Sequence, residues 1–355
     1  VDRRRDGPFP PVVVSLGGAG IYGAPIRSLG VPLYTLEMPR GRPSIAGMWR
    51  LARLVATLRP AILQGWMYHA NLAIAMAARL ARVSAPVLWN VRASIRTIGR
   101  EKLGTALAIR SGAVLSRWAA GIIYNAAVSR QQHEAIGYAA GRSRVIPNGF
   151  DCDFYRPDPV ARAAVRESLN VTPAQVLIGC FGRDDPMKDH ASFIAAAGRL
   201  TRLYPTWRFV MAGEGVTSSN ERLASQIAAA GLGNRLKLLG ERDDMPRLYA
   251  AIDVLCLASA WGEGFPNVLG EAMACGVPCV TTDTGDSAAI VGDAGCVVPA
   301  RDVEALALGI TSIATLDNVR RSALGAAARQ RMQAAYSIEQ VTSAYVSYYE
   351  ELAGH

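Results

Sequence analysis

The sequence has no long hydrophobic run. Nowhere in its 355 residues do the roughly 18 consecutive apolar residues needed for a membrane-spanning helix occur, because Arg79, Arg82, Arg110 and Arg117 interrupt the best candidates. The basic start, VDRRRDGPFPP, is not followed by an apolar segment with a small-residue cleavage site. We therefore expect no membrane span and no secretory signal, which favours the cytoplasm.

Metal-binding and P-loop motifs are also missing. Cys275 and Cys279 have no second Cys or His pair nearby in the sequence to complete a zinc site. Most cysteines lie in apolar segments, so we predict reduced packing residues and no bound metal. No Walker lysine motif occurs, so a P-loop is not the phosphate-binding device. The six cysteines are Cys152, Cys180, Cys256, Cys275, Cys279 and Cys296.

The composition is that of a folded protein with an uneven charge. Half of the residues are apolar and 19% are charged, which excludes a disordered chain. Residues 1–150 hold 20 Lys and Arg against 5 Asp and Glu, whereas residues 151–355 hold 18 against 24. Such a basic first half attracts anionic surfaces. We expect an anionic membrane surface or a lipid-linked acceptor as partner, and no nucleic acid; the alternative is a solvated basic face without a partner.

Strand and helix patterns alternate along the whole chain. Apolar, β-branched runs are separated by helical stretches such as residues 48–58, which predicts parallel sheets covered on both faces. We therefore expect an α/β protein with two Rossmann-like, doubly wound parallel-sheet domains and a cleft between them, where ligands meet the carboxyl ends of strands. The expected strands are residues 12–16, 31–36, 61–66, 86–91, 121–129, 176–182, 207–213, 236–240, 253–259 and 278–283.

The turn-rich segment 146–159 is the expected domain junction. Its prolines, Asn148 and Gly149 interrupt the pattern before it starts again. The length of the chain also favours two domains of roughly 150 residues each. We predict an amino-terminal domain over residues 1–150, a second domain over 151–335, and a last helical segment over 336–355 that packs back on the domains.

The segment WGEGFPNVLGEAMACGVPCV (261–280) is the most informative one. It follows an expected strand, turns at glycines and enters a helix near Pro266. The free N–H groups at such a helix start form an anion site. Arg183 and Lys188 follow another expected strand in CFGRDDPMKDH (180–190), where two cations can hold a diphosphate. Together these patterns favour binding of a nucleoside diphosphate.

These segments resemble glycosyltransferase family 4, a group of retaining enzymes with the GT-B fold. The resemblance covers most of the chain from about Val12 onward. It includes IPNGFD (146–151), the helix entry EGFPNVLGEAMACGVP (263–278), and two acids, Glu263 and Glu271, with seven residues between them. The resemblance implies a hexosyltransferase that uses a UDP or GDP sugar, without metal or cofactor, in cell-surface polysaccharide synthesis.

The family pattern also implies roles for individual residues. Glu263 matches the acid beside the donor sugar, and Glu271 the acid that holds the ribose hydroxyls. His69, in QGWMYHANL (64–72), matches a histidine near the reacting sugar, although a lone histidine is often structural. Arg92 is a weaker candidate for an acceptor phosphate. The matching donor-binding residues are Arg183, Lys188, Phe265, Pro266, Asn267, Val268 and Glu271.

The first residues allow other interpretations. Gly18, Gly20 and Gly23 form G-x-G-x-x-G, and Glu37 follows at the distance expected of an NAD-dependent oxidoreductase. The helix between them has room for roughly two turns and contains Pro25, which makes the crossover cramped. Compared with the family, we also expect a first strand, its double-glycine loop and a helix to be missing before Val12. An inactive homologue that binds only membrane or nucleotide is therefore a further alternative.

Overall fold

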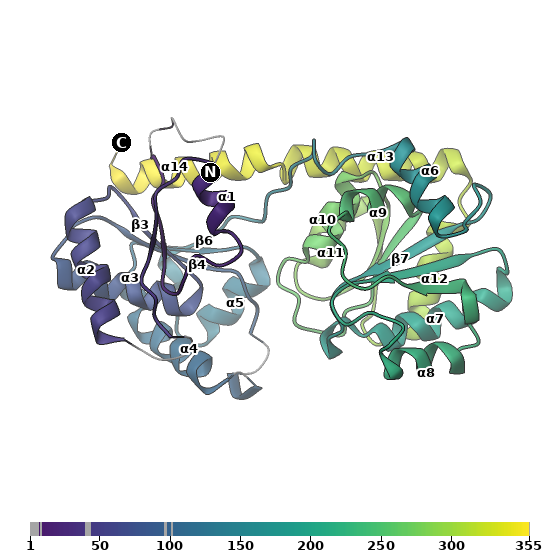
Figure 1. Ribbon diagram of the computed structural model, residues 1–355, viewed down its shortest axis with the longest axis horizontal. Helices are drawn as coiled ribbons and strands as arrows, with labels where there is room; N and C mark the ends of the chain where they lie inside the picture. The colour runs from purple at the N-terminus through teal and green to yellow at the C-terminus, as the bar shows by residue number, and fades with distance from the viewer. Residues whose placement is uncertain (1–6, 8, 40–43, 96–97, 101, 355) are drawn as a thin grey trace. The chain divides into compact units, whose positions relative to one another are not determined.

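The computed structural model describes residues 7, 9–39, 44–95, 98–100 and 102–354. Most of the basic start, residues 1–6 and 8, lies outside the described residues. The chain divides into two compact units, shown in Figure 1. Unit 1 comprises Val1–Asn125, Ser129–Ile146 and Ser343–His355, and unit 2 comprises Ala126–Val128 and Pro147–Thr342.

Unit 1 contains a four-stranded parallel sheet in the order β3-β4-β5-β6 and a separate parallel pair, β1-β2. Five of these strands lie where the apolar runs predicted them. Strand β6 was missed because its residues, Ser143, Arg144 and Val145, do not form an apolar run. The expectation that a strand and helix are absent before Val12 stays a prediction. The strands are β1 (Val13–Ser15), β2 (Leu33–Thr35), β3 (Leu63–Trp66), β4 (Val87–Val91), β5 (Gly121–Tyr124) and β6 (Ser143–Val145).

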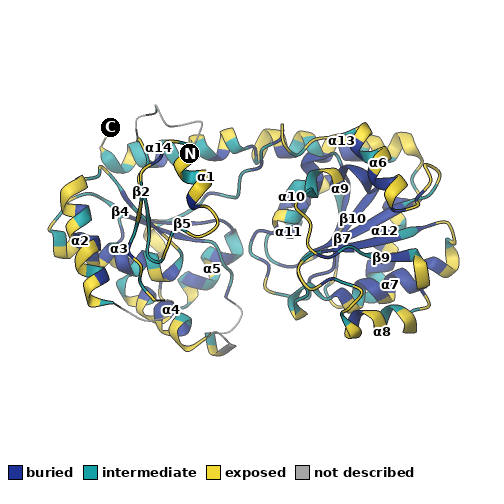
Figure 2. Cartoon of the chain, in the orientation of Figure 1, coloured by how far each residue is buried: buried dark blue, intermediate teal, exposed yellow. Residues whose placement is uncertain are grey.

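Helices cover both faces of the four-stranded sheet. The side chains of Trp89 and Ile122 lie on one face, in a core shared with α2 (Ile45–Leu58), α3 (Met67–Ala81) and α4 (Leu103–Leu115). The carboxyl-terminal part of α14 covers the other face, where the Tyr349 hydroxyl bonds Gln64. Figure 2 shows the buried strands between these partly exposed helices. The other helices of this unit are α1 (Gly23–Ser28) and α5 (Ala127–Ala135), and α14 spans Ile338–Ala353.

The connection between β1 and β2 contains only the short helix α1. It has six residues and includes Pro25, so it is shorter than the helix of a dinucleotide-binding crossover. Tyr22, the residue before this helix, makes no capping hydrogen bond through its side chain. This geometry does not support the oxidoreductase alternative.

Unit 2 is built on one six-stranded parallel sheet in the order β12-β11-β10-β7-β8-β9. From β7 the chain first adds β8 and β9 on one side and then returns to add β10, β11 and β12 on the other. The order therefore reverses between β7 and β10. The strands are β7 (Leu177–Phe181), β8 (Arg208–Ala212), β9 (Leu236–Leu238), β10 (Val254–Leu257), β11 (Cys279–Thr282) and β12 (Gly295–Val298).

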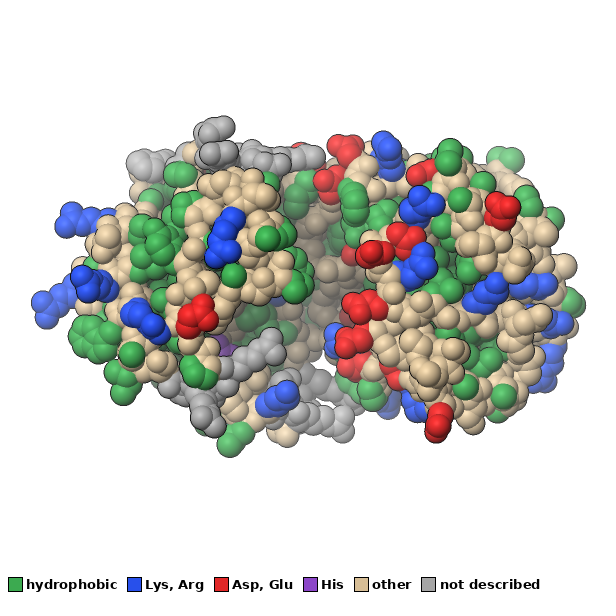
Figure 3. All heavy atoms as spheres, viewed as in Figure 1, with side chains coloured by type: hydrophobic (Ala, Val, Ile, Leu, Met, Phe, Trp, Pro, Cys, Tyr) green, Lys and Arg blue, Asp and Glu red, His purple; other side chains and the backbone are tan. Residues whose placement is uncertain are grey.

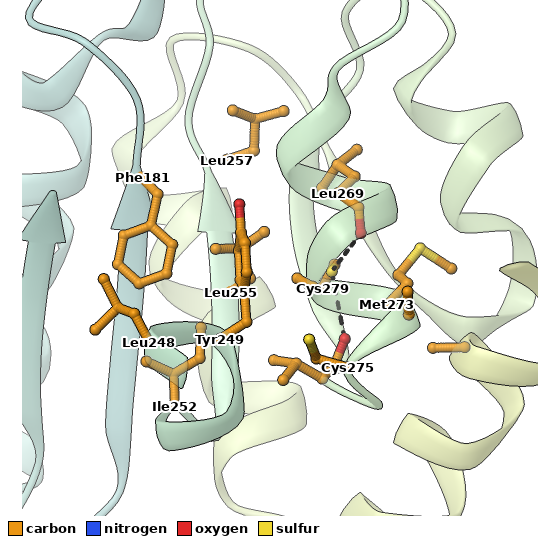
Figure 4. Close-up of a cluster of buried hydrophobic side chains, with 14 of the residues drawn as sticks. Phe181, Leu248, Tyr249, Ile252, Leu255, Leu257, Leu269, Met273, Cys275 and Cys279 are labelled. Carbon is orange, nitrogen blue, oxygen red and sulfur yellow. Dashed lines mark hydrogen bonds between the residues drawn. The ribbon is translucent and has the colours of Figure 1, made fainter. Parts of the chain in front are cut away.

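Two apolar cores flank this sheet. One lies beneath α7, α8 and α12, and the other beneath α6, α9, α10, α11 and α13. Figure 4 shows part of the second core, where Phe181 and Tyr249 meet edge to face and the Cys279 thiol points to the Leu269 carbonyl. All six cysteines have free thiols. The helices are α6 (Pro159–Ser168), α7 (His190–Leu203), α8 (Glu221–Ala229), α9 (Met245–Ala251), α10 (Asn267–Ala274), α11 (Ser287–Val291), α12 (Val303–Ala314) and α13 (Asn318–Ala335).

Among the described residues, every helix is too short or too polar to cross a bilayer.

Candidate functional site

The point where the strand order of unit 2 reverses brings two predicted residues together. Lys188 follows β7, at the end of a short 3₁₀ turn (Pro186–Lys188), and Glu263 follows β10. The Lys188 Nζ lies 2.6 Å from the Glu263 Oε1, and the two side chains are 13% and 7% exposed. Crevices at such reversal points are where open parallel sheets bind their ligands. The pair therefore occupies the position that the topology favours for a site.

Direct contact between the two loops fixes the position of this pair. The Ala260 N–H donates to the Met187 carbonyl at 2.8 Å. Gly262 has φ +78°, and a Cβ there would lie 2.7 Å from the Met187 sulfur. A larger residue at 262 would be strained and would push the loops apart. Glycine here is thus a requirement of the close approach that holds Lys188 beside Glu263.

Ser259 is a site residue that the sequence analysis missed. It is fully buried, and its hydroxyl donates to the Glu263 Oε1 at 2.6 Å. The Thr282 hydroxyl in turn donates to the Ser259 carbonyl at 2.6 Å. Glu263 therefore accepts from both an ammonium and a hydroxyl, which holds one carboxylate oxygen in place. A hydroxyl residue at the end of the run DVLCLAS, four residues before Glu263, is the signal that could have identified it.

The segment after Glu263 leads into the start of a helix, where the sequence analysis placed an anion site. Pro266 is the N-cap and α10 begins at Asn267, so the first N–H groups have no acceptor within the helix. The Phe265 side chain is buried and packs against Phe150. Phe265 can therefore contribute its backbone but not its ring. The Asn267 side chain accepts from Asn148 at 2.5 Å, which ties the helix start to the junction segment.

Glu271 lies on α10 and is held by a tyrosine. The Tyr249 hydroxyl, from α9, donates to the Glu271 Oε2 at 2.7 Å. Burial raises the pKa of the Glu271 carboxyl, while hydrogen bonds from Tyr249 and Tyr155 oppose that rise. A carboxylate fixed in this way can still accept from hydroxyl groups of a ligand through its remaining lone pairs. The tyrosines were not predicted, since they lie far from Glu271 in the sequence.

Arg183 stands apart from the Lys188–Glu263 pair. Its side chain is 58% exposed and its Nε lies 3.2 Å from the Asp185 Oδ2. The adjacent Asp184 turns elsewhere and accepts from Asn220 at 2.7 Å. The structure therefore places Arg183 on the same loop as Lys188 but leaves it exposed, in contact with its own loop.

In unit 1, Arg92 is part of an ordered cluster at the carboxyl ends of β3 and β4. Its Nη1 donates to the Tyr345 hydroxyl at 2.9 Å, and its guanidinium lies over the Trp66 ring at 5.2 Å. Asn90 donates to the same hydroxyl at 2.7 Å. Trp66 is 51% exposed. The cluster thus presents a cation and an open aromatic face; Trp66 and Tyr345 were not predicted as site residues.

His69 lies nearby in the fold, in the first turn of α3. The turn into this helix is sharp, with Met67 at φ +68°. The imidazole of His69 is exposed. Its side chain is therefore available to solvent rather than committed to the core, unlike the fully buried His133.

Two family profiles match the chain in succession. The profile described as "Glycosyltransferase Family 4" matches residues 5–154, and the profile described as "Glycosyl transferases group 1" matches residues 175–315. The first covers the strands of unit 1 and the second the Lys188–Glu263 pair and α10.

Curated relatives agree with these profiles. The lipopolysaccharide core biosynthesis mannosyltransferase LpsB of Rhizobium meliloti is 30% identical over 59% of this chain and 60% of its own length. A phosphatidyl-myo-inositol mannosyltransferase of Mycolicibacterium smegmatis is 30% identical over 63% of this chain and 55% of its own length. The chain therefore matches somewhat more than half of the length of these relatives.

Solved structures establish the fold. A crystal structure of Anabaena Alr3699/HepE in complex with UDP superposes with a TM-score of 0.85 at 22% identity and covers 99% of this chain and 93% of that one. With the successive profile matches and two parallel-sheet units, this likeness identifies the fold as GT-B. The chain therefore combines a glycosyltransferase family 4 domain with a domain of the glycosyl transferases group 1.

Proposed function

We propose that the protein is a retaining glycosyltransferase that transfers a sugar from a nucleoside diphosphate sugar to a lipid-linked or other anionic glycan acceptor of the cell envelope. The observation that carries the proposal is the buried Lys188–Glu263 pair at the strand-order reversal of unit 2, beside the free N–H groups of α10. Cations and amides neutralise a leaving diphosphate, so the proposal requires no metal and no cofactor.

The proposed donor site uses the residues around this pair. Lys188 has three N–H donors, so it can keep Glu263 and also bind a phosphate oxygen. The backbone of Phe265 to Val268 would bind the diphosphate or the sugar, and Arg183 would swing from Asp185 to the phosphates. Glu271, held by Tyr249, would accept from the ribose hydroxyls with its remaining lone pairs.

The proposed reaction needs no protein nucleophile. The bond between the anomeric carbon and the diphosphate breaks, and the acceptor hydroxyl forms its bond on the face that the leaving group vacates. Because the new bond forms on the same face as the broken one, the configuration is retained. The hydroxyl proton passes to the leaving phosphate oxygen. Lys188 and the α10 amides would stabilise the charge that develops on the phosphate, and Glu263 would orient the sugar.

Mannose is the first donor sugar to test. The two relatives described above are named mannosyltransferases, and their lipopolysaccharide core and phosphatidyl-inositol names are consistent with a glycolipid acceptor. The binding experiment below identifies the base of the donor nucleotide, uracil or guanine. On the acceptor side we propose His69 near the reacting sugar and Arg92 as the partner of an acceptor phosphate, with Trp66 as an aromatic face for a sugar ring.

The surface of unit 1 supports peripheral binding to an anionic membrane at its cytoplasmic face. Along α4, Leu103, Leu107 and Val114 are exposed by 76%, 53% and 60%, and Arg110 lies on the same exposed side. Apolar and basic side chains on one helix face are typical of helices that lie in a membrane interface. On the face in Figure 3, Lys and Arg side chains are spread over unit 1 with few acids among the described residues.

A binding panel tests the donor site. UDP, GDP, ADP and NAD⁺ are titrated calorimetrically against the wild type and Lys188→Ala. We expect one nucleoside diphosphate to bind the wild type and to bind the variant at least tenfold more weakly, as for loss of a charged hydrogen bond. Equal binding to both proteins, or binding of NAD⁺ alone, would contradict the proposal.

Vesicle sedimentation tests the membrane surface. Wild type and Leu107→Asp are mixed with phosphatidylglycerol and with phosphatidylcholine vesicles. We expect binding to the anionic vesicles, weakened in Leu107→Asp but not in Leu308→Asp, which changes an exposed leucine of α12 in unit 2. Binding that is equal in all three proteins would refute a role for α4.

A further inference from the structure

We propose a second anion site in unit 2, at the amino ends of β8 and β9, which binds a phosphate group. A cavity of about 220 Å³ opens there, and Arg208, Arg235 and Lys237 line it together with the amides of Asn170 and Asn234. The proposed nucleotide site follows the carboxyl ends of strands. With β8 five residues long, the two sites are separated by roughly 16 Å along the strand direction, so this cavity is distinct from the donor site.

Strand pairing and the turn before β9 bring the cations to one cavity. Val210 of β8 pairs with Lys237 of β9. Side chains alternate along a strand, so Arg208, two residues before Val210, points to the same face as Lys237. Arg235 lies in the 3₁₀ turn Gly233–Arg235 just before β9 and lines the same cavity. Like charges in that arrangement repel, unless an anion lies between them.

No acidic side chain relieves this repulsion in the described part of the chain. None of the ion pairs between described residues includes Arg208, Arg235 or Lys237. Their partners are backbone carbonyls: Lys237 donates to Leu169 at 2.6 Å, Arg208 to Trp207 at 3.0 Å and to Pro205 at 3.0 Å, and Arg235 to Thr201 at 3.3 Å.

The arginines keep donors for a ligand. Each guanidinium has five N–H groups, and the carbonyl bonds of both arginines use the Nη1 atoms. The Nε and Nη2 groups therefore remain for oxygen atoms in the cavity. Planar guanidinium groups match the oxygen spacing of phosphate, and the asparagine amides add neutral donors.

The size of the cavity limits the ligand. Sites for drug-sized ligands have roughly 300 to 1,000 Å³, so about 220 Å³ suits a single phosphate group and little more. That group can come from a free anion, such as inorganic phosphate or a small phosphate ester, or from a lipid headgroup. The recognition chemistry is the same, and the two sources are separated by experiment.

Calorimetric titration with inorganic phosphate, at constant ionic strength against chloride, tests the site. We expect phosphate to bind the wild type and to bind Arg208→Gln and Arg235→Gln at least tenfold more weakly, the loss expected for one charged hydrogen bond. Arg202→Gln is the matched control, because Arg202 is an exposed arginine of the neighbouring α7 that does not line the cavity. It should bind like the wild type.

Further measurements distinguish the two sources of the phosphate group and the two proposed binding sites. In one measurement, phosphatidylglycerol vesicles are used in place of inorganic phosphate. If the protein binds the vesicles only when Arg208 and Arg235 are present, and does not bind free phosphate, the ligand of the site is a lipid headgroup. Lys188→Ala should still bind phosphate at this site, and Arg208→Gln should still bind the nucleoside diphosphate. If neither phosphate nor vesicles distinguish the arginine variants from Arg202→Gln in folded protein, the proposal is overturned, whatever the result for the nucleotide.

Discussion

The carboxylate of Glu263 accepts from the Lys188 ammonium and the Ser259 hydroxyl through the same oxygen, Oε1, at 2.6 Å each. The lysine comes from the loop after β7 and the serine from the end of β10, so two strands fix one carboxylate. Its second oxygen remains for a ligand. The acid in this site is therefore oriented before any donor arrives, which lowers the ordering cost of binding.

Lys188→Ala should lower the turnover number by about 10²-fold or more, because one cation that stabilises the leaving diphosphate is lost. The assay is transfer of labelled sugar at saturating donor. Arg202→Ala removes an exposed cation elsewhere in unit 2 and should leave the rate unchanged. An unaltered rate in Lys188→Ala would remove that residue from the proposed mechanism.

Ser259→Ala should reduce the turnover number by about tenfold with little change in the KM for the donor, since one hydrogen bond that orients Glu263 is lost. Steady-state kinetics separates the two parameters, and a thermal melt checks that the protein remains folded. Ser259→Thr keeps a hydroxyl and should restore part of the rate. A rise in KM alone would argue for a role in binding rather than in positioning the acid.

Tyr345→Phe should raise the KM for the acceptor several-fold and leave the KM for the donor unchanged. The phenol accepts from Arg92 and Asn90, so its loss removes one of the contacts that position the guanidinium, which we assign to the acceptor phosphate. Tyr349→Phe is the matched control, because that hydroxyl bonds Gln64 on the same helix face. Equal effects of both variants would indicate a structural role of α14 only.

Much of the fold could be predicted because buried parallel strands have a simple signature. The runs VLIGCFG and DVLCLAS are apolar throughout, as strands covered on both faces must be, and they became β7 and β10. Strands β6 and β12 lacked this signal: β6 is three residues long, and β12 keeps residues that are partly or fully exposed. Edge strands with mixed burial cannot be separated from loops by hydrophobicity alone.

The site was predicted where its residues follow strand ends, and missed where the partner is distant in sequence. Lys188 and Glu263 were each expected at a strand end, and the sheet order brings them together. Tyr249 bonds Glu271 from another helix, and Tyr345 meets Arg92 from 253 residues away. Such pairs depend on tertiary packing, which local patterns do not contain. The roles of all the predicted site residues, Lys188 and Glu263 included, stay predictions.

The stability of unit 1 should decrease as the pH falls from about 6.5 to 4. His133 is buried; its Nδ1 donates to the Ser129 carbonyl and its Nε2 accepts from Tyr68, and burial lowers its pKa to about 4. The pKa of this histidine is 6.5 in the unfolded chain and about 4 in the folded one. Between these values the unfolded chain binds the proton more readily, so the stability of the folded protein rises with pH in this range. Thermal melts at pH 4.5 to 8 measure the slope.

His133→Gln removes this proton uptake. Its melting temperature at pH 8 should be lower than that of the wild type, but it should fall less on acidification. An identical pH dependence in both proteins would show that His133 does not contribute to the acid sensitivity.

Unit 1 is assembled from segments on both sides of unit 2 in the chain. The part of α14 from Ser343 onward covers Gln64 and Asn90 on one face of the four-stranded sheet. During synthesis this segment leaves the ribosome after unit 2, although the strands it covers were made first. Folding in order of synthesis is therefore interrupted for unit 1. Its sheet keeps one face uncovered until translation has passed residue 343, and nascent chains that stall earlier should be the ones that engage chaperones.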